Sequence, residues 1–158
     1  MIHFLFDLDN TLVLHQNRVN YQWMYQDNEL TYYLDHCNKK GNCYLYTNGN
    51  RNHAEEILTR MKIKDKFHEL YNRDNVIYMK PELKSFDVVH SDLSERDNGI
   101  KIIYFFDDLL ENLESASKFG WYTIWIHPNY HTAKKYPYVN LSFQNIKDAL
   151  KYLETNLP

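Results

Sequence analysis

The chain has 158 residues, of which 44% are hydrophobic and 25% are charged, a composition typical of one soluble globular domain. Its formal net charge of -3 provides no basic field for a nucleic-acid backbone or an anionic membrane. No apolar run approaches the roughly 18 residues of a membrane span, and the N-terminus lacks the pattern of a secretion signal. We therefore expect one cytoplasmic domain over residues 1–158 that does not bind membranes.

Five short runs of apolar, β-branched and aromatic residues predict buried strands. In chain order they cover residues 2–6, 43–46, 76–78, 101–106 and 122–126. Between these runs the apolar residues recur at helical spacing. Three helices are predicted from these residues. The first has Pro81 in its first turn and an apolar face of Leu83, Phe86, Val89 and Leu93; the second ends at Gly120 and has Leu109, Leu110, Leu113 and Ala116 on one face. The third is capped by Ser142 and has an apolar face of Ile146, Leu150 and Leu153. A further helix is expected around Arg51 to Met61.

Strands that alternate with helices favour parallel pairing through right-handed crossovers. We therefore predict a Rossmann-like three-layer α/β/α sandwich with a central parallel sheet. In such folds, ligands bind beyond the carboxyl ends of the strands. Polar residues follow three of the predicted strands: Asp7 and Asp9, Thr47 and Asn48, and Asp107 and Asp108. These side chains should meet at one edge of the sheet.

The acidic strand ends indicate a metal site. Magnesium prefers oxygen ligands and commonly takes one or two carboxylates together with a phosphate oxygen. A Mg²⁺ ion beside Asp7, Asp9 and Asp108 would allow these carboxylates to lie close together, which would otherwise be unfavourable. We therefore expect Mg²⁺ as the cofactor and a phosphate group as its partner.

A phosphate bound at this edge would be open to attack by a carboxylate. Lys80, the Thr47 hydroxyl and the backbone amides near Asn48 are predicted to bind the phosphate oxygens. Asp7 is the predicted nucleophile, which forms an aspartyl-phosphate. Asp9 lies two residues later and points to the same side of an extended segment, so we assign it the role of acid and base. Together these residues predict phosphoryl transfer.

Each of these signals also has a simpler interpretation. Two acidic residues after an apolar run are commonly an exposed strand end, and Asp107 and Asp108 would also suit a helix N-terminus. The 8 histidines are dispersed without the spacing of a zinc site, and we expect them at the surface or at the rim of the core. The order of all four signals along the chain favours the phosphoryl site.

Four stretches, FDLDNTL, YTNG, KP and FFDD, resemble in this order and spacing the haloacid dehalogenase superfamily of phosphohydrolases. The stretch IYFFDDLLENLESASKFGWYTIWIHP is similar to the corresponding part of pyrimidine 5'-nucleotidase-like members. The resemblance implies that Asp7 is the nucleophile, that Asp9 is the acid and base and binds metal through its backbone carbonyl, and that Asp108 is a metal carboxylate. It also implies that Thr47 and Lys80 hold the phosphate.

The fourth stretch carries two further expectations from the resemblance. Asp107 and Asn112 are expected to support the metal shell rather than to ligate the ion. Leu109 stands where members of the superfamily usually have Ser or Thr, which removes one expected hydrogen bond near the metal.

The chain leaves little room for the cap, the inserted module that closes over the site in many members of the superfamily. Residues 15–25, HQNRVNYQWMY, are what remains for it, so we predict a rudimentary cap. Within it, His15, Arg18, Tyr21 and Trp23 are candidates to line the substrate site through stacking and polar contacts. The resemblance to capless members implies that such an open site would accept a bulky phosphoester or borrow a lid from a second subunit of a homo-oligomer.

The leading functional hypothesis is a magnesium-dependent phosphomonoesterase that acts on a nucleoside monophosphate or another small phosphoester. A second hypothesis keeps the chemistry but makes the substrate a polynucleotide end or a phosphoprotein, although the net charge disfavours nucleic acid. A third is a catalytically silent binding module with the same fold. Activity against a panel of phosphoesters separates the three.

Overall fold

The computed structural model describes residues 1–16, 18–96 and 99–158, so residue 17 of the predicted cap segment lies outside the described part. Within it, six parallel strands form one sheet in the order β3-β2-β1-β4-β5-β6. The strands are β1 (Ile2–Phe6), β2 (Asn42–Tyr46), β3 (Glu69–Tyr71), β4 (Ile102–Asp107), β5 (Tyr122–Ile126) and β6 (Leu141–Phe143). The predicted α/β fold with a central parallel sheet is confirmed.

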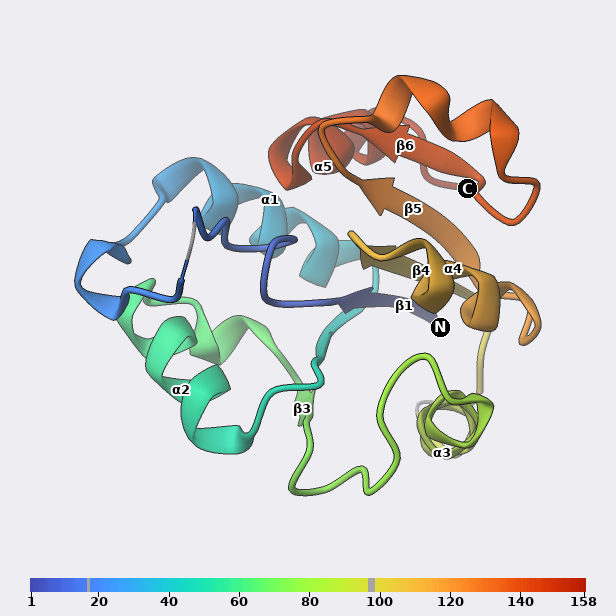
Figure 1. Cartoon of the computed structure of the whole chain (residues 1–158), viewed down its shortest axis with the longest axis horizontal. Coiled ribbons are helices and arrows are strands. Elements are labelled where there is room, and N and C mark those ends of the chain that lie inside the picture. The colour runs from blue at the N-terminus through green and yellow to red at the C-terminus, as the bar shows by residue number, and fades with distance from the viewer. Residues whose placement is uncertain (17, 97–98) are drawn as a thin grey trace.

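Helices cover both faces of this sheet, and α2 and α3 lie on opposite sides of β3 in Figure 1. The α-helices are α1 (Asn28–Lys40), α2 (Arg51–Arg60), α3 (Leu83–Ser94), α4 (Leu110–Ser117) and α5 (Ile146–Thr155), and the 3-10 helices are η1 (Tyr21–Trp23), η2 (Lys64–Lys66) and η3 (Tyr130–Lys135). One hydrophobic core lies between the sheet and α1, α2 and α5, and a second lies between the sheet and α3 and α4. The central strands are therefore buried on both faces, as continuous apolar runs require.

Local side-chain chemistry sets where several helices begin. The side chains of Asp27, Asn50 and Asn145 accept hydrogen bonds from the first free amides of α1, α2 and α5. The prediction that Ser142 caps the last helix is wrong, because Ser142 belongs to β6. Pro81 likewise precedes α3 rather than lying in its first turn.

The third predicted strand, residues 76–78, is not a strand, and β3 lies earlier at Glu69–Tyr71. The reason is a tight turn after β3, where the Asn72 carbonyl accepts from the amides of Asn75 and Val76, and the Asn72 side chain accepts from the amide of Asp74. The chain therefore leaves the sheet, and the side chain of Ile77 is 80% exposed.

The segment between β1 and α1 is short and holds no inserted domain within the described residues. It contains an isolated β-bridge between Asp9 and Val13 and the short 3-10 helix η1.

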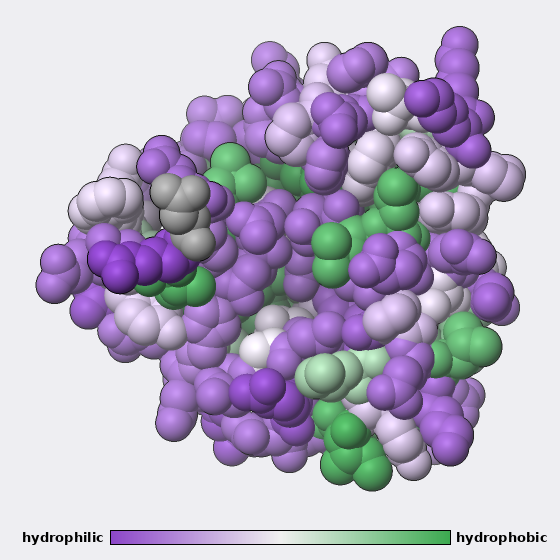
Figure 2. Space-filling view, viewed as in Figure 1, coloured by the Kyte–Doolittle hydropathy of each residue, from purple (hydrophilic) through white to green (hydrophobic). Residues whose placement is uncertain are grey.

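No described helix is long and apolar enough to cross a membrane. The face shown in Figure 2 is mainly hydrophilic, with hydrophobic residues in separate patches.

The aromatic packing beneath α3 generates a first prediction. Phe86 is fully buried and contacts the rings of Tyr46, Phe105 and Trp121 at 5.3–5.9 Å between centroids. Replacing Phe86 with Ala should lower the free energy of unfolding by about 3–5 kcal/mol, because it leaves a cavity among these rings. Val88→Ala on the same helix, where the residue is 42% exposed, should change it by less than about 0.5 kcal/mol. Urea unfolding measures both, and equal losses would contradict the assignment of this core.

Candidate active site

The register of β1 and β4 brings the predicted acidic residues together. Phe6 pairs with Phe106, and the amide of Asp7 donates to the carbonyl of Phe106 at 2.9 Å, so Asp7 leaves the sheet beside Asp107. Asp7, Asp107 and Asp108 each offer a carboxylate oxygen, and these oxygens lie within 4.8 Å of one another. We call these three residues the acidic cluster.

Lys80 neutralises part of this charge. Its ammonium donates to Asp7 Oδ1 at 3.1 Å, to Asp107 Oδ2 at 2.9 Å and to the carbonyl of Tyr46 at 2.7 Å, and its side chain is 1% exposed. Burial alone would lower the pKa of Lys80, but Asp107 and Asp7 outweigh burial and raise that pKa above its ordinary value. Because all three ammonium protons have acceptors, Lys80 must exchange one of these bonds to contact a phosphate.

Asn48 fixes the backbone of Lys80. The Asn48 side chain accepts from the Lys80 amide at 2.8 Å and donates to the Lys80 carbonyl at 2.9 Å. Its oxygen and nitrogen are thus both engaged by Lys80, which leaves the predicted phosphate contact at Asn48 to the backbone. Thr47 is buried at the end of β2, and its hydroxyl accepts from the amide of Gly49 at 3.0 Å.

Thr11 is a site residue that the sequence analysis missed. Its hydroxyl lies 3.0 Å from Asp7 Oδ2 and 3.4 Å from Asp108 Oδ1, and the residue is 1% exposed. A single hydroxyl proton is thereby shared between two carboxylates. The signal was present as the threonine of FDLDNTL, four residues after Asp7.

Asp107 and Asn112 are arranged as support for the cluster. The fully buried Asp107 carboxylate accepts from Lys80, from the amide of Leu109 at 2.9 Å and from Asn112 Nδ2 at 3.1 Å. Burial and the charge of Asp7 raise the pKa of Asp107 to about 6, although Lys80 opposes them. The Leu109 side chain, where Ser or Thr was expected, is 45% exposed and makes its contact through the backbone.

Asp108 carries the strongest charge conflict of the three. Burial, Asp107 and Asp7, in that order, raise its pKa from 3.8 to about 8. A divalent cation would remove this conflict, and carboxylate oxygens are the ligands that Mg²⁺ takes. Asp107 is fully buried and accepts three hydrogen bonds, whereas Asp7 accepts two and Asp108 accepts one from the hydroxyl that it shares with Asp7. Asp7 and Asp108 are therefore the carboxylates best able to hold the ion.

Asp9 lies outside the acidic cluster and is held by two histidines. Asp9 Oδ1 is 2.6 Å from His15 Nε2, and both Asp9 oxygens are 2.9 Å from His53 Nε2. Tyr21 joins this group through its hydroxyl, 2.7 Å from His53 Nδ1. His15 and Tyr21 therefore lie in the group around Asp9, and their predicted role of lining the substrate site stays a prediction. The contact of His53 with Asp9 was not predicted, because nothing in the spacing of His53 marks it.

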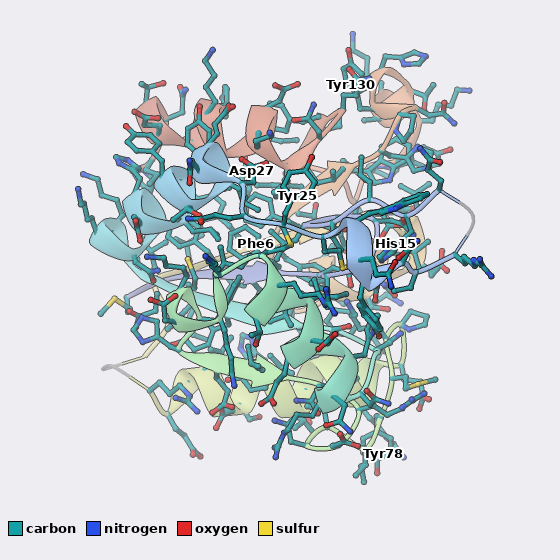
Figure 3. All side chains as sticks on the ribbon, turned by 90° about the vertical axis from the view of Figure 1, so that its left-hand side faces the viewer. Phe6, His15, Tyr25, Asp27, Tyr78 and Tyr130 are labelled. Carbon is teal, nitrogen blue, oxygen red and sulfur yellow. The ribbon has the colours of Figure 1, made fainter. Side chains whose placement is uncertain are left out.

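The other two candidates from the cap segment lie farther out. Arg18 and Trp23 help to line a cavity of about 620 Å³, and Trp23 is 70% exposed. Figure 3 shows Tyr25 and Asp27 farther along the same segment, where it leads into α1.

The expectation of a surface or rim position for every histidine is wrong for His3, which is fully buried in β1.

The charge conflict at Asp108 predicts a pH dependence. Because the folded protein raises the pKa of Asp108 from 3.8 to about 8, this group favours folding below about pH 4, and its contribution is lost as the pH rises towards 8. In metal-free protein, Asp108→Asn should therefore raise the Tm at pH 8 by about 3 °C or more and have less effect at pH 5.

Thermal unfolding in a chelator at both pH values measures this effect. The matched control is Asp87→Asn, at an exposed aspartate of α3, which should shift the Tm equally at the two pH values. A shift for Asp108→Asn that does not depend on pH would contradict the proposed charge conflict.

Solved structures share this fold at low sequence identity. A magnesium-bound protein assigned as a HAD-hydrolase, YfnB from Bacillus subtilis, is 14% identical with a TM-score of 0.65, and the match covers 80% of this chain and 55% of that chain. For L-2-haloacid dehalogenase from Xanthobacter autotrophicus these values are 12%, 0.63, 87% and 64%. This chain therefore spans little more than half of YfnB and less than two thirds of the dehalogenase.

A third structure matches along nearly its whole length. It is the core domain of a protein from Streptococcus pneumoniae TIGR4 assigned as a phosphoglycolate phosphatase, which is 19% identical with a TM-score of 0.64 and coverage of 98% of this chain and 96% of that chain. These structures establish the haloacid dehalogenase fold. The family model described as NLI interacting factor-like phosphatase matches residues 2–119, well over half of the sequence. The chain therefore belongs to the NLI interacting factor-like phosphatase family.

Proposed function

We propose that the protein is a magnesium-dependent phosphomonoesterase that forms an aspartyl-phosphate on Asp7. The observation that carries this proposal is the placement of the Lys80 ammonium 3.1 Å from Asp7 and 2.9 Å from Asp107, beside Asp108. A nucleophile, a cation and a pair of available metal carboxylates thus lie within one small region. A silent binding module would have no need for this costly arrangement of buried charges.

Each residue has a distinct task in the proposed reaction. An ion held by Asp7, Asp108 and the Asp9 backbone carbonyl would supply positive charge against the phosphate oxygens. Asp7 attacks phosphorus, the bond from phosphorus to the leaving oxygen breaks, and Asp9 gives that oxygen a proton. Asp9 then takes a proton from water as the water oxygen attacks phosphorus, which releases phosphate and restores Asp7. Lys80 and Thr47 bind the phosphate oxygens.

Space beside Asp9 supports a small phosphoester as the substrate. An open hollow of about 580 Å³ shares Tyr21 and His53 with the group around Asp9, and we place the leaving group of the substrate there. Its other lining residues are Gly49, Asn50, Asn52, Glu56 and Arg73. A nucleoside leaving group, as the resemblance to nucleotidase-like proteins implies, would fit its size and polar lining.

The short segment between Val13 and α1 favours a second candidate. With η1 as its only regular element in the described residues, it leaves the site accessible to a phosphate on a larger molecule, such as a phosphoprotein or a polynucleotide end. Tyr78 and Tyr130 lie at opposite ends of the molecule in Figure 3, which does not support one aromatic stacking surface for a nucleic acid.

We propose the cytoplasm as the location of the protein. Cys37 and Cys43 are buried and form no disulfide, which suits a reducing compartment.

Removal of the nucleophile tests the chemistry. Asp7→Asn should lower phosphate release from 4-nitrophenyl phosphate by about 10³-fold or more, because no covalent intermediate can form. The wild type should form a hydroxylamine-sensitive phosphoenzyme and should lose activity in a chelator, while Asp87→Asn retains both properties. Undiminished turnover in Asp7→Asn would rule out the proposed nucleophile.

The substrate class is tested by comparing kcat/KM among nucleoside monophosphates, a 5'-phosphorylated oligonucleotide and a phosphoserine peptide. We expect the nucleoside monophosphates to be at least about tenfold better than the oligonucleotide, because the net charge of -3 opposes approach of a polyanion. Preference for the peptide or the oligonucleotide would instead support the second candidate.

A further inference from the structure

The Asp9 carboxylate is embedded in a hydrogen-bonded group that the family resemblance does not account for. It contacts His15 and His53 through the Nε2 atom of each ring, and His53 continues the group to the hydroxyl of Tyr21. His15 and His53 side chains are only 9% and 18% exposed. Three separate parts of the chain, the loop after β1, η1 and α2, thus converge on one carboxylate.

The hydrogen-bond partners determine the roles of the His53 ring. Asp9 Oδ1 can only accept, both when Asp9 is ionised and when it carries a proton on Oδ2, so His53 Nε2 must carry the proton that it donates to Oδ1. In the neutral ring, Nδ1 is then an acceptor, and the Tyr21 hydroxyl 2.7 Å away is its donor. Tyr21 therefore favours the tautomer in which His53 donates to Asp9.

The position of the His53 ring is also prepared by the surrounding chain. The His53 amide donates to the Asn50 side chain at 2.8 Å in the first turn of α2. A Cβ atom at Gly49 would lie 2.9 Å from His53 Cδ2, closer than such atoms ordinarily approach, so glycine leaves room for the ring. This arrangement holds His53 towards Asp9 before any substrate is present.

The two oxygens of Asp9 are not equivalent in this group. Oδ1 is within hydrogen-bond distance of both His15 and His53, whereas Oδ2 is within that distance of His53 alone. Each carboxylate oxygen has room for about two hydrogen bonds, so Oδ1 is fully occupied. Oδ2 retains room for a proton.

We propose that His53, assisted by Tyr21 and His15, is a positioning residue that holds Asp9 so that Oδ2 exchanges the proton with the leaving-group oxygen and later with water. This inference rests on the proposed function and assigns to it residues outside the motifs. The proton passes from Asp9 Oδ2 to the leaving oxygen as the bond from phosphorus to that oxygen breaks. The histidines themselves gain and lose no proton.

The test exploits the fact that a poor leaving group needs its proton more than a good one does. In His53→Phe, kcat/KM should fall for both phenyl phosphate and 4-nitrophenyl phosphate, but by roughly tenfold or more further for phenyl phosphate. Tyr21→Phe should show the same pattern more weakly. His53→Gln, which keeps a donor near the Nε2 position, should restore part of the loss for phenyl phosphate.

His90→Phe provides the matched control. His90 is a half-buried histidine on α3 that accepts from Trp121 Nε1 at 2.9 Å, and its replacement should lower stability without changing the ratio of the two esters. Equal falls for both esters in His53→Phe, with the wild type active, would overturn the positioning role and leave the proposed function intact. A wild type inactive towards both esters would overturn both.

A second measurement does not depend on turnover. In metal-free protein labelled with ¹⁵N-histidine, NMR should show hydrogen-bonded Nε2 protons for His15 and His53, and Asp9→Ala should abolish these signals while leaving the resonances of His90 in place. Unchanged signals in Asp9→Ala would show that the histidines do not hold this carboxylate and would overturn the inference.

Discussion

The repulsion among three carboxylates at the ends of β1 and β4 is the constraint around which the rest of the site is built. Like charges this close are unfavourable away from water unless a cation offsets them. Lys80 offsets part of the charge from a buried position, and the raised pKa of Asp108 shows that the remainder is not compensated by the protein alone. The folded chain therefore holds an acidic site that a divalent cation would stabilise, and relief of this repulsion is the physical basis for the metal binding that we propose.

The sheet can hold these charges together because the strands beneath them are rigid. β1 lies between β2 and β4, and Phe6 stacks on Phe106 with ring centroids 4.6 Å apart. Both residues are fully buried. Neither strand end can therefore move away from the other, which would separate the carboxylates, without loss of packing in the core. Asn48 and Asn112 extend this rigidity by fixing the Lys80 backbone and the Asp107 side chain. Apolar packing thus balances the electrostatic cost of the site.

The sequence made the fold and the acidic edge predictable because both depend on local patterns and on strand order. Apolar runs located β1, β2, β4 and β5, and parallel pairing then required their polar ends to meet. β3 was misplaced because the side chain of Asn72 stabilises a turn that apolar spacing does not reveal. The contact of His53 with Asp9 spans 44 positions in sequence, and no periodicity links the two residues. The contact of the Asn48 side chain with the Lys80 backbone could not be predicted either, because the two residues become neighbours only in the folded chain.

In the proposed reaction the site has a phosphate side and a leaving-group side, which are built from different kinds of structure, and this difference bears on specificity. The phosphate side consists of buried strand ends and Lys80, where a small displacement would disturb both charge balance and core packing. The leaving-group side consists of α2, η1 and the loop that carries His15, which meet at Asp9. Loops on a rigid scaffold can change with little effect on its stability. Substitutions along this second side could therefore alter which phosphoester is accepted while the acidic cluster and its reaction stay the same, provided that the hydrogen bonds to Asp9 are kept.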